Sequence, residues 1–341
     1  MRLLLPLAVL LALAFPAGAT SGSPSSSGAG LVWAFYYPWY GTPAVDGQWE
    51  HWNQDGHDPP DDIASSYYPA QGLYSSSDEA VVAQQMQEIK ASGIDGIVYS
   101  WWGRGSREDS RLPMVLSIAR EYGVAVAAHI EPYRGRTVAS VVEDVAYLRT
   151  LGISTFFIYQ TFDQPVDQWA AAQAALHAGG TTLFAQTDLA GEAAAAGFDG
   201  VYTYDIVTYG GNELGRLCQD ARREHLLCAP SVGPGFDARR GDGDPRLKPR
   251  RNGHTYDAMW GSAIAAHPDE VTITSFNEWH EGTQIEPAAP PSRHGEYRYL
   301  SYDGAWGLYG TAAEDAYLQR TLYWSNVFRS TFASQEKMRH S

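Results

Sequence analysis

The chain has 341 residues, with 24 Lys and Arg against 39 Asp and Glu, so its formal net charge is −15. Nucleic acids and anionic membrane surfaces bind clustered Lys and Arg, and this balance argues against both as partners. Aromatic residues make up 13% of the chain, including 11 Trp and 21 Tyr. They fit either a well-packed core or a cleft in which rings stack on sugars.

The N-terminal segment is predicted to lie outside the fold. A positive residue precedes an apolar run from Leu3 to Phe15, and Ala17-Gly18-Ala19 fits a signal-peptidase site. The run is too short for a permanent membrane helix. We predict a cleaved signal peptide over residues 1–19, a disordered Ser/Gly-rich tether over 20–30 and one catalytic domain over 31–335. We therefore expect a secreted protein, extracellular or periplasmic, with no membrane contact beyond export.

Strand-like runs alternate with helix-like patterns along the remaining chain. The predicted strands are Leu31–Trp39, Gly96–Trp102, Val124–Glu131, Thr155–Gln160, Thr181–Thr187, Gly200–Asp205, Leu226–Val232 and Val271–Phe276. The predicted helices are Glu79–Ser92, Asp109–Tyr122, Val138–Leu151, Val166–Ala178, Leu189–Ala196, Glu213–His225, Tyr256–Ala266 and Ala312–Phe328. Alternation predicts parallel βαβ units, and eight of them predict an α/β fold, a single (β/α)8 TIM barrel with long βα loops.

The two cysteines leave two interpretations open. Cys218 falls on a predicted helix and Cys228 on the next strand, so export permits a disulfide between them. Two buried free thiols fit equally well. No Cys or His spacing is typical of a metal site, and we predict no metal.

The last predicted strand leads into a segment with two carboxylates, Glu278 and Glu281. Glycoside cleavage needs one carboxyl group to protonate the leaving oxygen and a second as base, nucleophile or charge stabiliser. Residues three apart on an extended strand face opposite sides, so the chain must turn here, which Gly282 would help. Trp279 and His280 between them could raise one pKa by burial. The alternative is a pair of solvated loop carboxylates.

Other polar and aromatic residues gather where predicted strands end. Alternation puts His129 and Glu131 on one face, either holding sugar hydroxyls or stiffening the barrel as a buried pair. The aromatic residues at three strand ends favour a carbohydrate platform. Arg250 and Arg251 follow the seventh strand and could bind hydroxyls or belong to a basic surface loop; Asp205 has the same ambiguity.

Six segments between Phe35 and Pro287 carry a family pattern. They are Tyr-Tyr-Pro-Trp-Tyr-Gly, His-Trp-Asn, Tyr-Tyr-Pro-Ala-x-Gly-x-Tyr-Ser-Ser, His-Ile-Glu-Pro-Tyr-x-Gly-Arg, Ala-Pro-Ser-Val-Gly-Pro-Gly and Ser-Phe-Asn-Glu-Trp-His-Glu-Gly-Thr-Gln-Ile-Glu. Together they resemble glycoside hydrolase family 99, which holds endo-α-1,2-mannosidases and bacterial endo-α-1,2-mannanases. The resemblance implies a (β/α)8 barrel, internal cleavage of α-mannosides with retained configuration, and no metal or cofactor.

The resemblance also implies residue roles. Glu278 matches the residue that deprotonates the sugar 2-hydroxyl to give a 1,2-anhydro sugar, and Glu281 matches the general acid that later acts as base. The substrate-binding residues expected on this pattern are Tyr37, Trp101, Trp102, His129, Glu131, Tyr133, Tyr202, Tyr204, Arg251, Asn277 and Trp279. Arg250 competes with Arg251, and Tyr202 with Tyr204. Trp101 or Trp102 matches the region that contacts the −2 sugar.

The sequence thus predicts a secreted endo-α-1,2-mannosidase or mannanase, active as a monomer on α-mannan or another mannose-containing glycan. One alternative is a related glycosidase of different α-linkage specificity. Another is a non-catalytic sugar-binding barrel, against which the intact pair of Glu278 and Glu281 counts. The natural polysaccharide and the −2 sugar stay open.

Overall fold

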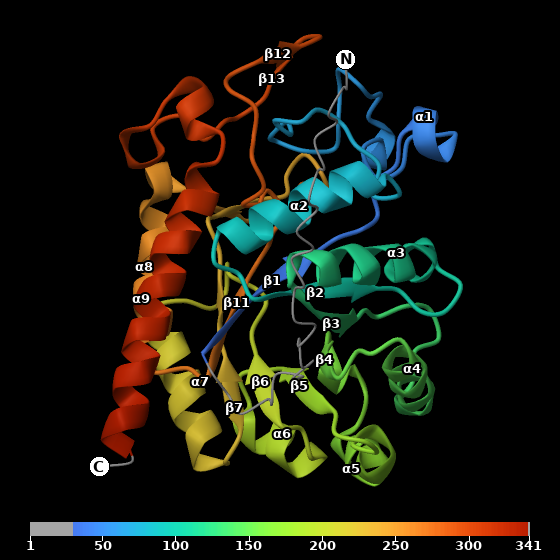
Figure 1. Cartoon of the computed structure of the whole chain (residues 1–341), viewed down its shortest axis with the longest axis vertical. Helices are drawn as coiled ribbons and strands as arrows, with labels where there is room; N and C mark the ends of the chain where they lie inside the picture. Colours follow the sequence, from blue (N-terminus) through green and yellow to red (C-terminus); the bar gives the residue numbers. More distant parts are fainter. Residues whose placement is uncertain (1–29, 340–341) are drawn as a thin grey trace, which may run out of the picture.

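Nine parallel strands form one sheet in the computed structural model, which describes residues 30–339 (Figure 1). The predicted signal peptide and most of the predicted tether lie outside these residues. The strands are β1 Leu31–Tyr36, β2 Gly96–Trp101, β3 Ala125–Ile130, β4 Thr155–Ile158, β5 Thr182–Gln186, β6 Gly200–Tyr202, β7 Leu227–Ala229, β8 Ser231–Val232 and β11 Glu270–Ile273. Their order is β7-β6-β5-β4-β3-β2-β1-β11-β8.

The two ends of that order belong to one stretch of chain. Strands β7 and β8 are separated only by Pro230, which has no backbone N–H for the ladder. The backbone N–H of Thr272 donates to the Pro230 carbonyl at 3.1 Å, and that of Cys228 donates to Asp269 Oδ2 at 2.9 Å. The sheet therefore closes with eight barrel positions, and the predicted (β/α)8 fold is confirmed.

A helix follows each barrel position. They are α2 Glu79–Ala91, α3 Arg107–Tyr122, α4 Val138–Thr150, α5 Val166–Leu176, α6 Ala190–Ala196, α7 Asn212–Arg223, α8 His254–Ala265 and α9 Ala316–Arg339. All eight predicted helices are present. The bounds of α9 differ most from the prediction of Ala312–Phe328. A 3-10 turn over Gly310–Ala313 delays the start of this helix, and the helix continues to Arg339. Within residues 30–339 no helix combines the length and apolar character needed to span a membrane.

Short side chains start several of these helices. The Asp78 carboxylate accepts from the backbone N–H of Ala80, and Ser106 Oγ accepts from that of Asp109. Thr137 and Ser140 form a reciprocal capping box at the start of α4. These contacts satisfy N–H groups that have no partner within the helix.

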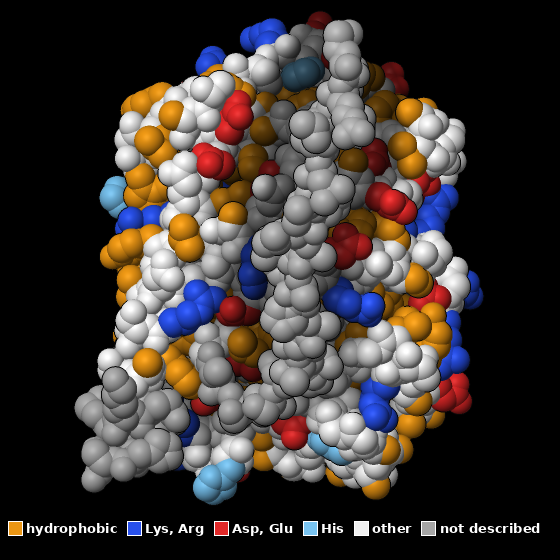
Figure 2. Space-filling model, viewed as in Figure 1, with side chains coloured by type: hydrophobic (Ala, Val, Ile, Leu, Met, Phe, Trp, Pro, Cys, Tyr) orange, Lys and Arg blue, Asp and Glu red, His pale blue; other side chains and the backbone are white. Residues whose placement is uncertain are grey.

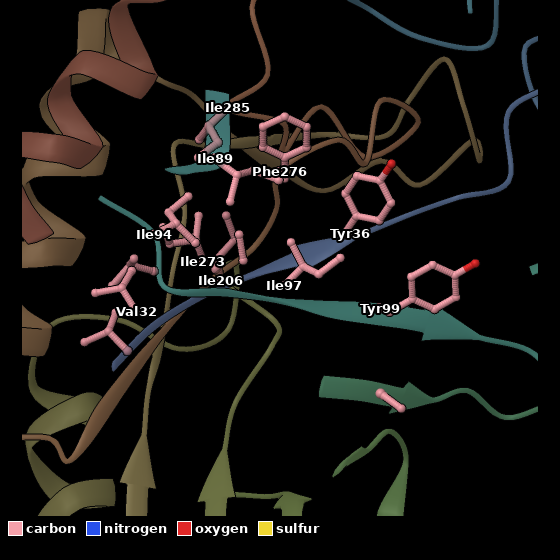
Figure 3. Packing of buried hydrophobic residues seen from close by; sticks show 14 of the residues in the cluster. Val32, Tyr36, Ile89, Ile94, Ile97, Tyr99, Ile206, Ile273, Phe276 and Ile285 are labelled. Atoms are coloured by element: carbon pink, nitrogen blue, oxygen red, sulfur yellow. The ribbon is translucent and has the colours of Figure 1, made fainter. Parts of the chain in front are cut away.

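Alternation along the strands builds two cores. On β1, Trp33 and Phe35 face the barrel interior, whereas Val32 and Tyr36 face the helices. Figure 3 shows the outer core, where the rings of Tyr36 and Tyr99 lie side by side with centroids 6.2 Å apart. The inner core fills the barrel, so only its mouth is open to a ligand.

The long loops gather at one end of the molecule. They carry α1 Pro43–Asp46 and the hairpin of β12 Arg293–His294 and β13 Tyr297–Arg298, both at the top of Figure 1. A second hairpin pairs β9 Phe236–Asp237 with β10 Leu247–Lys248. On the face in Figure 2, acidic and basic side chains are interspersed and no large patch of one sign is seen.

A disulfide joins Cys218 on α7 to Cys228 on β7, with their Cα atoms 5.2 Å apart. Of the two interpretations left open by the sequence, the structure has the bridge. It ties a helix to the strand that follows it.

Gly96 on β2 is required by the packing of the inner core. A Cβ there would lie 2.4 Å from Trp33 Cζ3 and 2.9 Å from the Ala125 carbonyl oxygen. We expect Gly96→Ala to lower the free energy of unfolding by about 1–3 kcal/mol, because neither neighbour can move freely. Gly191→Ala on α6 is the control: nothing lies within 4 Å of its Cβ, and alanine favours helix by up to about 1 kcal/mol. Urea unfolding measures both, and equal stability of the two variants would contradict this account.

Candidate active site

The mouth of the barrel holds a cavity of about 330 Å³ formed by strand ends and loops. It is lined by Tyr37, Trp39, His51, Gln54, Trp102, His129, Glu131, Pro132, Tyr159, Tyr204, Asp242, Glu278, His280 and Glu281. The carboxyl ends of β1, β2, β3, β4 and β6 and three longer loops therefore converge on one space.

The segment after β11 turns back on itself to enter this cavity. The backbone N–H of Ser275 donates to the Thr283 carbonyl at 2.9 Å, and that of Ile285 donates to the Ser275 carbonyl at 3.0 Å. Glu278 and Glu281 lie inside the closed loop, and both line the cavity. The predicted turn between the two carboxylates is present.

Glu278 is nearly fully buried, with 2% of its surface exposed. Its Oε1 accepts from the backbone N–H of His280 at 2.9 Å, and its own N–H donates to Ser275 Oγ at 2.8 Å. His280 Nε2 lies 2.9 Å from the His51 carbonyl and must carry the proton to donate to it. Burial lowers the pKa of His280 to about 3, so the ring is neutral and turns an unprotonated Nδ1, 3.4 Å away, toward Glu278.

Glu281 lies beside a pair of tyrosines. Tyr204 Oη donates to Glu281 Oε2 at 3.2 Å and also hydrogen-bonds to Tyr37 Oη. Tyr204 has φ 58°, so the chain has already left the strand and turns this ring toward the mouth. Glu281 thus has a hydroxyl partner, while Glu278 is held by the backbone.

The two carboxyl groups perturb each other. Burial raises the pKa of Glu278 well above its usual value, and the charges of Glu281 and Asp242 raise it further. Burial, followed by the charge of Asp242, raises the pKa of Glu281 to about 8. Groups in this state lose their protons in two coupled steps. Between these steps one proton remains on the pair, which is the form an acid and base pair requires.

A second polar group lines the opposite wall. His129 Nδ1 lies 2.8 Å from Glu131 Oε1, and Ser100 Oγ donates to the same oxygen at 2.7 Å. Trp102 Nε1 donates to Ser100 Oγ at 3.1 Å, which fixes the ring at the edge of the cavity. No residue among 30–339 hydrogen-bonds the second Glu131 oxygen, so this oxygen can accept a sugar hydroxyl.

Seven of the predicted site residues share this cavity: Tyr37, Trp102, His129, Glu131, Tyr204, Glu278 and Glu281. Five others support it from behind. Trp101 faces outward and donates to Asp109 Oδ1 at 2.9 Å, and the Tyr133 hydroxyl bonds Asp144 and Ser140. The Asn277 side chain holds the Tyr37 backbone, accepting at 2.7 Å and donating at 3.0 Å.

Trp279 and Tyr202 complete that supporting set. Trp279 Nε1 donates to Glu286 Oε2 at 2.8 Å, away from the cavity. Tyr202 Oη lies 2.8 Å from His129 Nε2, one layer below the cavity in the barrel core. Tyr202 therefore orients His129, which lines the cavity, whereas Trp279 is held by the buried Glu286.

Neither predicted arginine lines the cavity. Arg251 is exposed and borders a separate, larger cavity of about 600 Å³ between α7 and α8. Arg250 packs among tyrosines, 4.7 Å from the Tyr67 ring centroid and 4.6 Å from that of Tyr317. Its Nη2 donates to the Gly282 carbonyl at 2.9 Å, so it holds the loop that carries Glu281.

Three lining residues lie outside both the predicted site and the six family segments, so the sequence did not indicate them. Tyr159 follows β4 directly, and the rule that active-site residues lie past strand ends could have found it. Gln54 and Asp242 come from long loops, and Gln54 Nε2 donates to Asp242 Oδ1 at 2.6 Å. No periodic pattern in either loop indicates this contact. Within residues 30–339, no cluster of three or more His, Cys, Asp or Glu has an arrangement for a metal ion.

Two coupled carboxyl groups at the carboxyl-terminal mouth of a (β/α)8 barrel define the class of a glycoside hydrolase. The family model described as glycosyl hydrolase family 99 matches residues 29–330. The chain belongs to that family and is a glycoside hydrolase.

Relatives of known sequence, and one of known structure, agree with this family assignment. A glycoprotein endo-alpha-1,2-mannosidase of Mus musculus is 32% identical over 365 residues, 89% of this chain and 77% of the relative. A glycoprotein endo-alpha-1,2-mannosidase-like protein of Danio rerio is 32% identical over 351 residues, 86% and 77% of the two chains. The solved GH99 endo-alpha-mannosidase of Bacteroides thetaiotaomicron superposes with a TM-score of 0.79 at 31% identity, covering 88% of this chain and 98% of that one.

Asp242 sets the pH range of the carboxyl pair. Its charge raises the pKa of both Glu278 and Glu281, so Asp242→Asn should lower both pKa values. The form with one proton on the pair then exists at lower pH, and both limbs of the bell-shaped profile of kcat/KM should move to lower pH. Asp58→Asn is the control, because this exposed carboxylate is not among the charges that shift the pKa of Asp242 or of the pair, and its profile should match wild type. An alkaline limb that stays in place in Asp242→Asn would contradict the assignment.

Proposed function

We propose that the protein is an exported, retaining, endo-acting α-mannosidase that hydrolyses internal α-1,2-mannosidic bonds of α-mannan or another mannose-containing glycan. The observation that carries this proposal is the placement of Glu278 and Glu281 in one cavity with raised pKa values. The relatives are endo-alpha-1,2-mannosidases or an endo-alpha-mannosidase, and they supply the substrate class.

In the first step, Glu278 takes the proton of the sugar 2-hydroxyl, and the 2-oxygen attacks C1. The bond from C1 to the glycosidic oxygen breaks, and Glu281 gives that oxygen its proton. The product is a 1,2-anhydro sugar on one side and a free leaving sugar on the other. The buried, backbone-held Glu278 suits the base, and Glu281 with its raised pKa suits the acid.

In the second step, Glu281 takes a proton from water while the water oxygen attacks C1. The bond from C1 to the 2-oxygen breaks, and the proton held by Glu278 returns to the 2-oxygen. Two inversions at C1 give overall retention. In α-mannosides the axial 2-hydroxyl lies opposite the departing group, so this route fits the proposed substrate.

The subsites follow from the lining residues. His129, Glu131, Tyr37 and Tyr204 surround the space next to the two glutamates and are suited to the −1 sugar. Trp102 at the edge offers a ring to the sugar beyond it. We also propose export through residues 1–19 and action as a monomer; the N-terminal residue of the secreted chain and its mass in solution test these two points.

Wild-type protein incubated with α-mannan should release a disaccharide, and Glu281→Gln should reduce kcat for this substrate by about 10²–10⁴-fold. The same variant should lose less on α-1,3-mannobiosyl fluoride, because fluoride needs little protonation to leave. Glu224→Gln, an exposed carboxylate after α7, is the control and should match wild type. Equal losses on both substrates would remove Glu281 as the acid. Good binding without release would favour a sugar-binding barrel, and release from glucans alone another linkage specificity.

The 1,2-anhydro route has its own test. A substrate in which the reacting mannose carries 2-deoxy or 2-fluoro in place of the 2-hydroxyl has no proton for Glu278 to remove, so the wild-type enzyme should leave it uncleaved. Binding of this analogue, measured by titration calorimetry, shows that the lack of turnover is chemical. Ready hydrolysis of the analogue would contradict the route.

A further inference from the structure

A second, smaller cavity of about 50 Å³ opens beside Glu281. It shares Tyr159, Tyr204 and Glu281 with the main cavity but does not include Glu278. Its other lining residues are Asp205, Ile206, Phe236, Arg246, Thr274 and Thr283. We propose that Arg246 is a specificity-determining residue that binds a neutral sugar on the leaving-group side of the scissile bond. This inference rests on the proposed function.

The position of the two glutamates indicates on which side of the scissile bond each cavity lies. The acid protonates the oxygen that joins two sugars, so one sugar must lie on each side of Glu281. The main cavity contacts both glutamates and therefore holds the sugar whose C1 and 2-hydroxyl react. The small cavity contacts only Glu281, so it lies where the departing sugar begins.

Arg246 is anchored in this small cavity. Its Nε donates to Asp244 Oδ2 at 2.8 Å, its Nη2 lies 2.7 Å from the same oxygen, and its Nη1 donates to Asp205 Oδ2 at 3.0 Å. The guanidinium also lies 5.3 Å from the ring centroid of Phe236. Asp205 in turn accepts from the backbone N–H of Val207 at 2.8 Å. The cation is thus held in one orientation before a ligand arrives.

The anchoring leaves donors for a ligand. A guanidinium has five N–H groups, and the contacts with Asp244 and Asp205 use three of them. Half of the Arg246 side chain is exposed. Within residues 30–339, these contacts leave one N–H on Nη1 and one on Nη2 without a partner. Both are therefore available to neighbouring hydroxyl oxygens of a sugar.

The charge balance gives the ligand class. Two carboxylates surround the one guanidinium of Arg246, and Glu281 lies in the same cavity. A phosphate or sulfate group would meet a site with no excess positive charge, whereas neutral hydroxyls need only donors. The ligand that fits is an uncharged hexopyranose with adjacent free hydroxyls.

Two substrates separate this role from catalysis. Arg246→Ala should lower kcat/KM on a neutral α-1,2-mannan oligosaccharide by about tenfold to hundredfold, since hydrogen bonds from a charged donor are lost. On α-1,3-mannobiosyl fluoride, which has no leaving sugar, it should stay within about twofold of wild type. Arg239→Ala is the matched control, because that arginine lies in the same loop, is bound to Asp237 at 2.8 Å, and borders neither cavity. Equal losses on both substrates, or no loss on either, would overturn the proposal.

A binding measurement keeps this result distinct from failure of the proposed function. Titration calorimetry with α-1,2-mannotriose should show affinity reduced by a similar factor in Arg246→Ala and unchanged in Arg239→Ala. If wild type cleaves no mannoside, the proposed function fails, and the calorimetry alone decides on Arg246. Equal affinity of wild type and Arg246→Ala, or binding by neither, overturns the leaving-group site.

Discussion

The return of the chain between Ser275 and Ile285 is the constraint on which the arrangement of Glu278 and Glu281 depends. Glu278 and Glu281 are three residues apart, and an extended strand would point them to opposite faces. The hydrogen bonds from Ser275 to Thr283 and from Ile285 to Ser275 close the segment into a loop. Inside that loop both carboxyl groups reach the same cavity. A single loop, rather than two strands, therefore sets the spacing of the acid and the base.

A closed loop with two buried carboxyl groups needs support, and two buried groups supply it. Glu286 accepts from Tyr74 Oη at 2.8 Å, from Trp279 Nε1 at 2.8 Å and from Gln85 Nε2 at 2.7 Å, so its carboxylate is well satisfied. It fixes the indole of Trp279, which lies between Glu278 and Glu281 in the sequence. Arg250 holds the other side through the Gly282 and Gln284 carbonyls. The hydrogen bonds that Glu286 and Arg250 make to this segment therefore stabilise its structure.

The fold could be predicted because alternating strand and helix patterns repeat eight times, and both glutamates of the proposed catalytic pair could be placed because they follow the last strand. Deciding which member of each aromatic pair lines the cavity required the three-dimensional structure. Trp101 and Trp102 are adjacent, and alternation with the inward-facing Ser100 selects Trp102. Tyr202 and Tyr204 share one face, so only depth along the barrel separates them. Alternation carries no information about depth, and none about loops such as the one that carries Arg246.

The charges of the cavity connect its chemistry to its substrate. Its lining includes the carboxyl groups of Glu131, Asp242, Glu278 and Glu281, and no Lys or Arg among the described residues. Burial, together with the charges of neighbouring carboxyl groups, raises the pKa of both Glu278 and Glu281 and so keeps a proton on the pair, as the acid step of the proposed mechanism requires. The same negative charges would repel an anionic glycan, so the arrangement that suits Glu281 to the proposed acid role also favours an uncharged substrate.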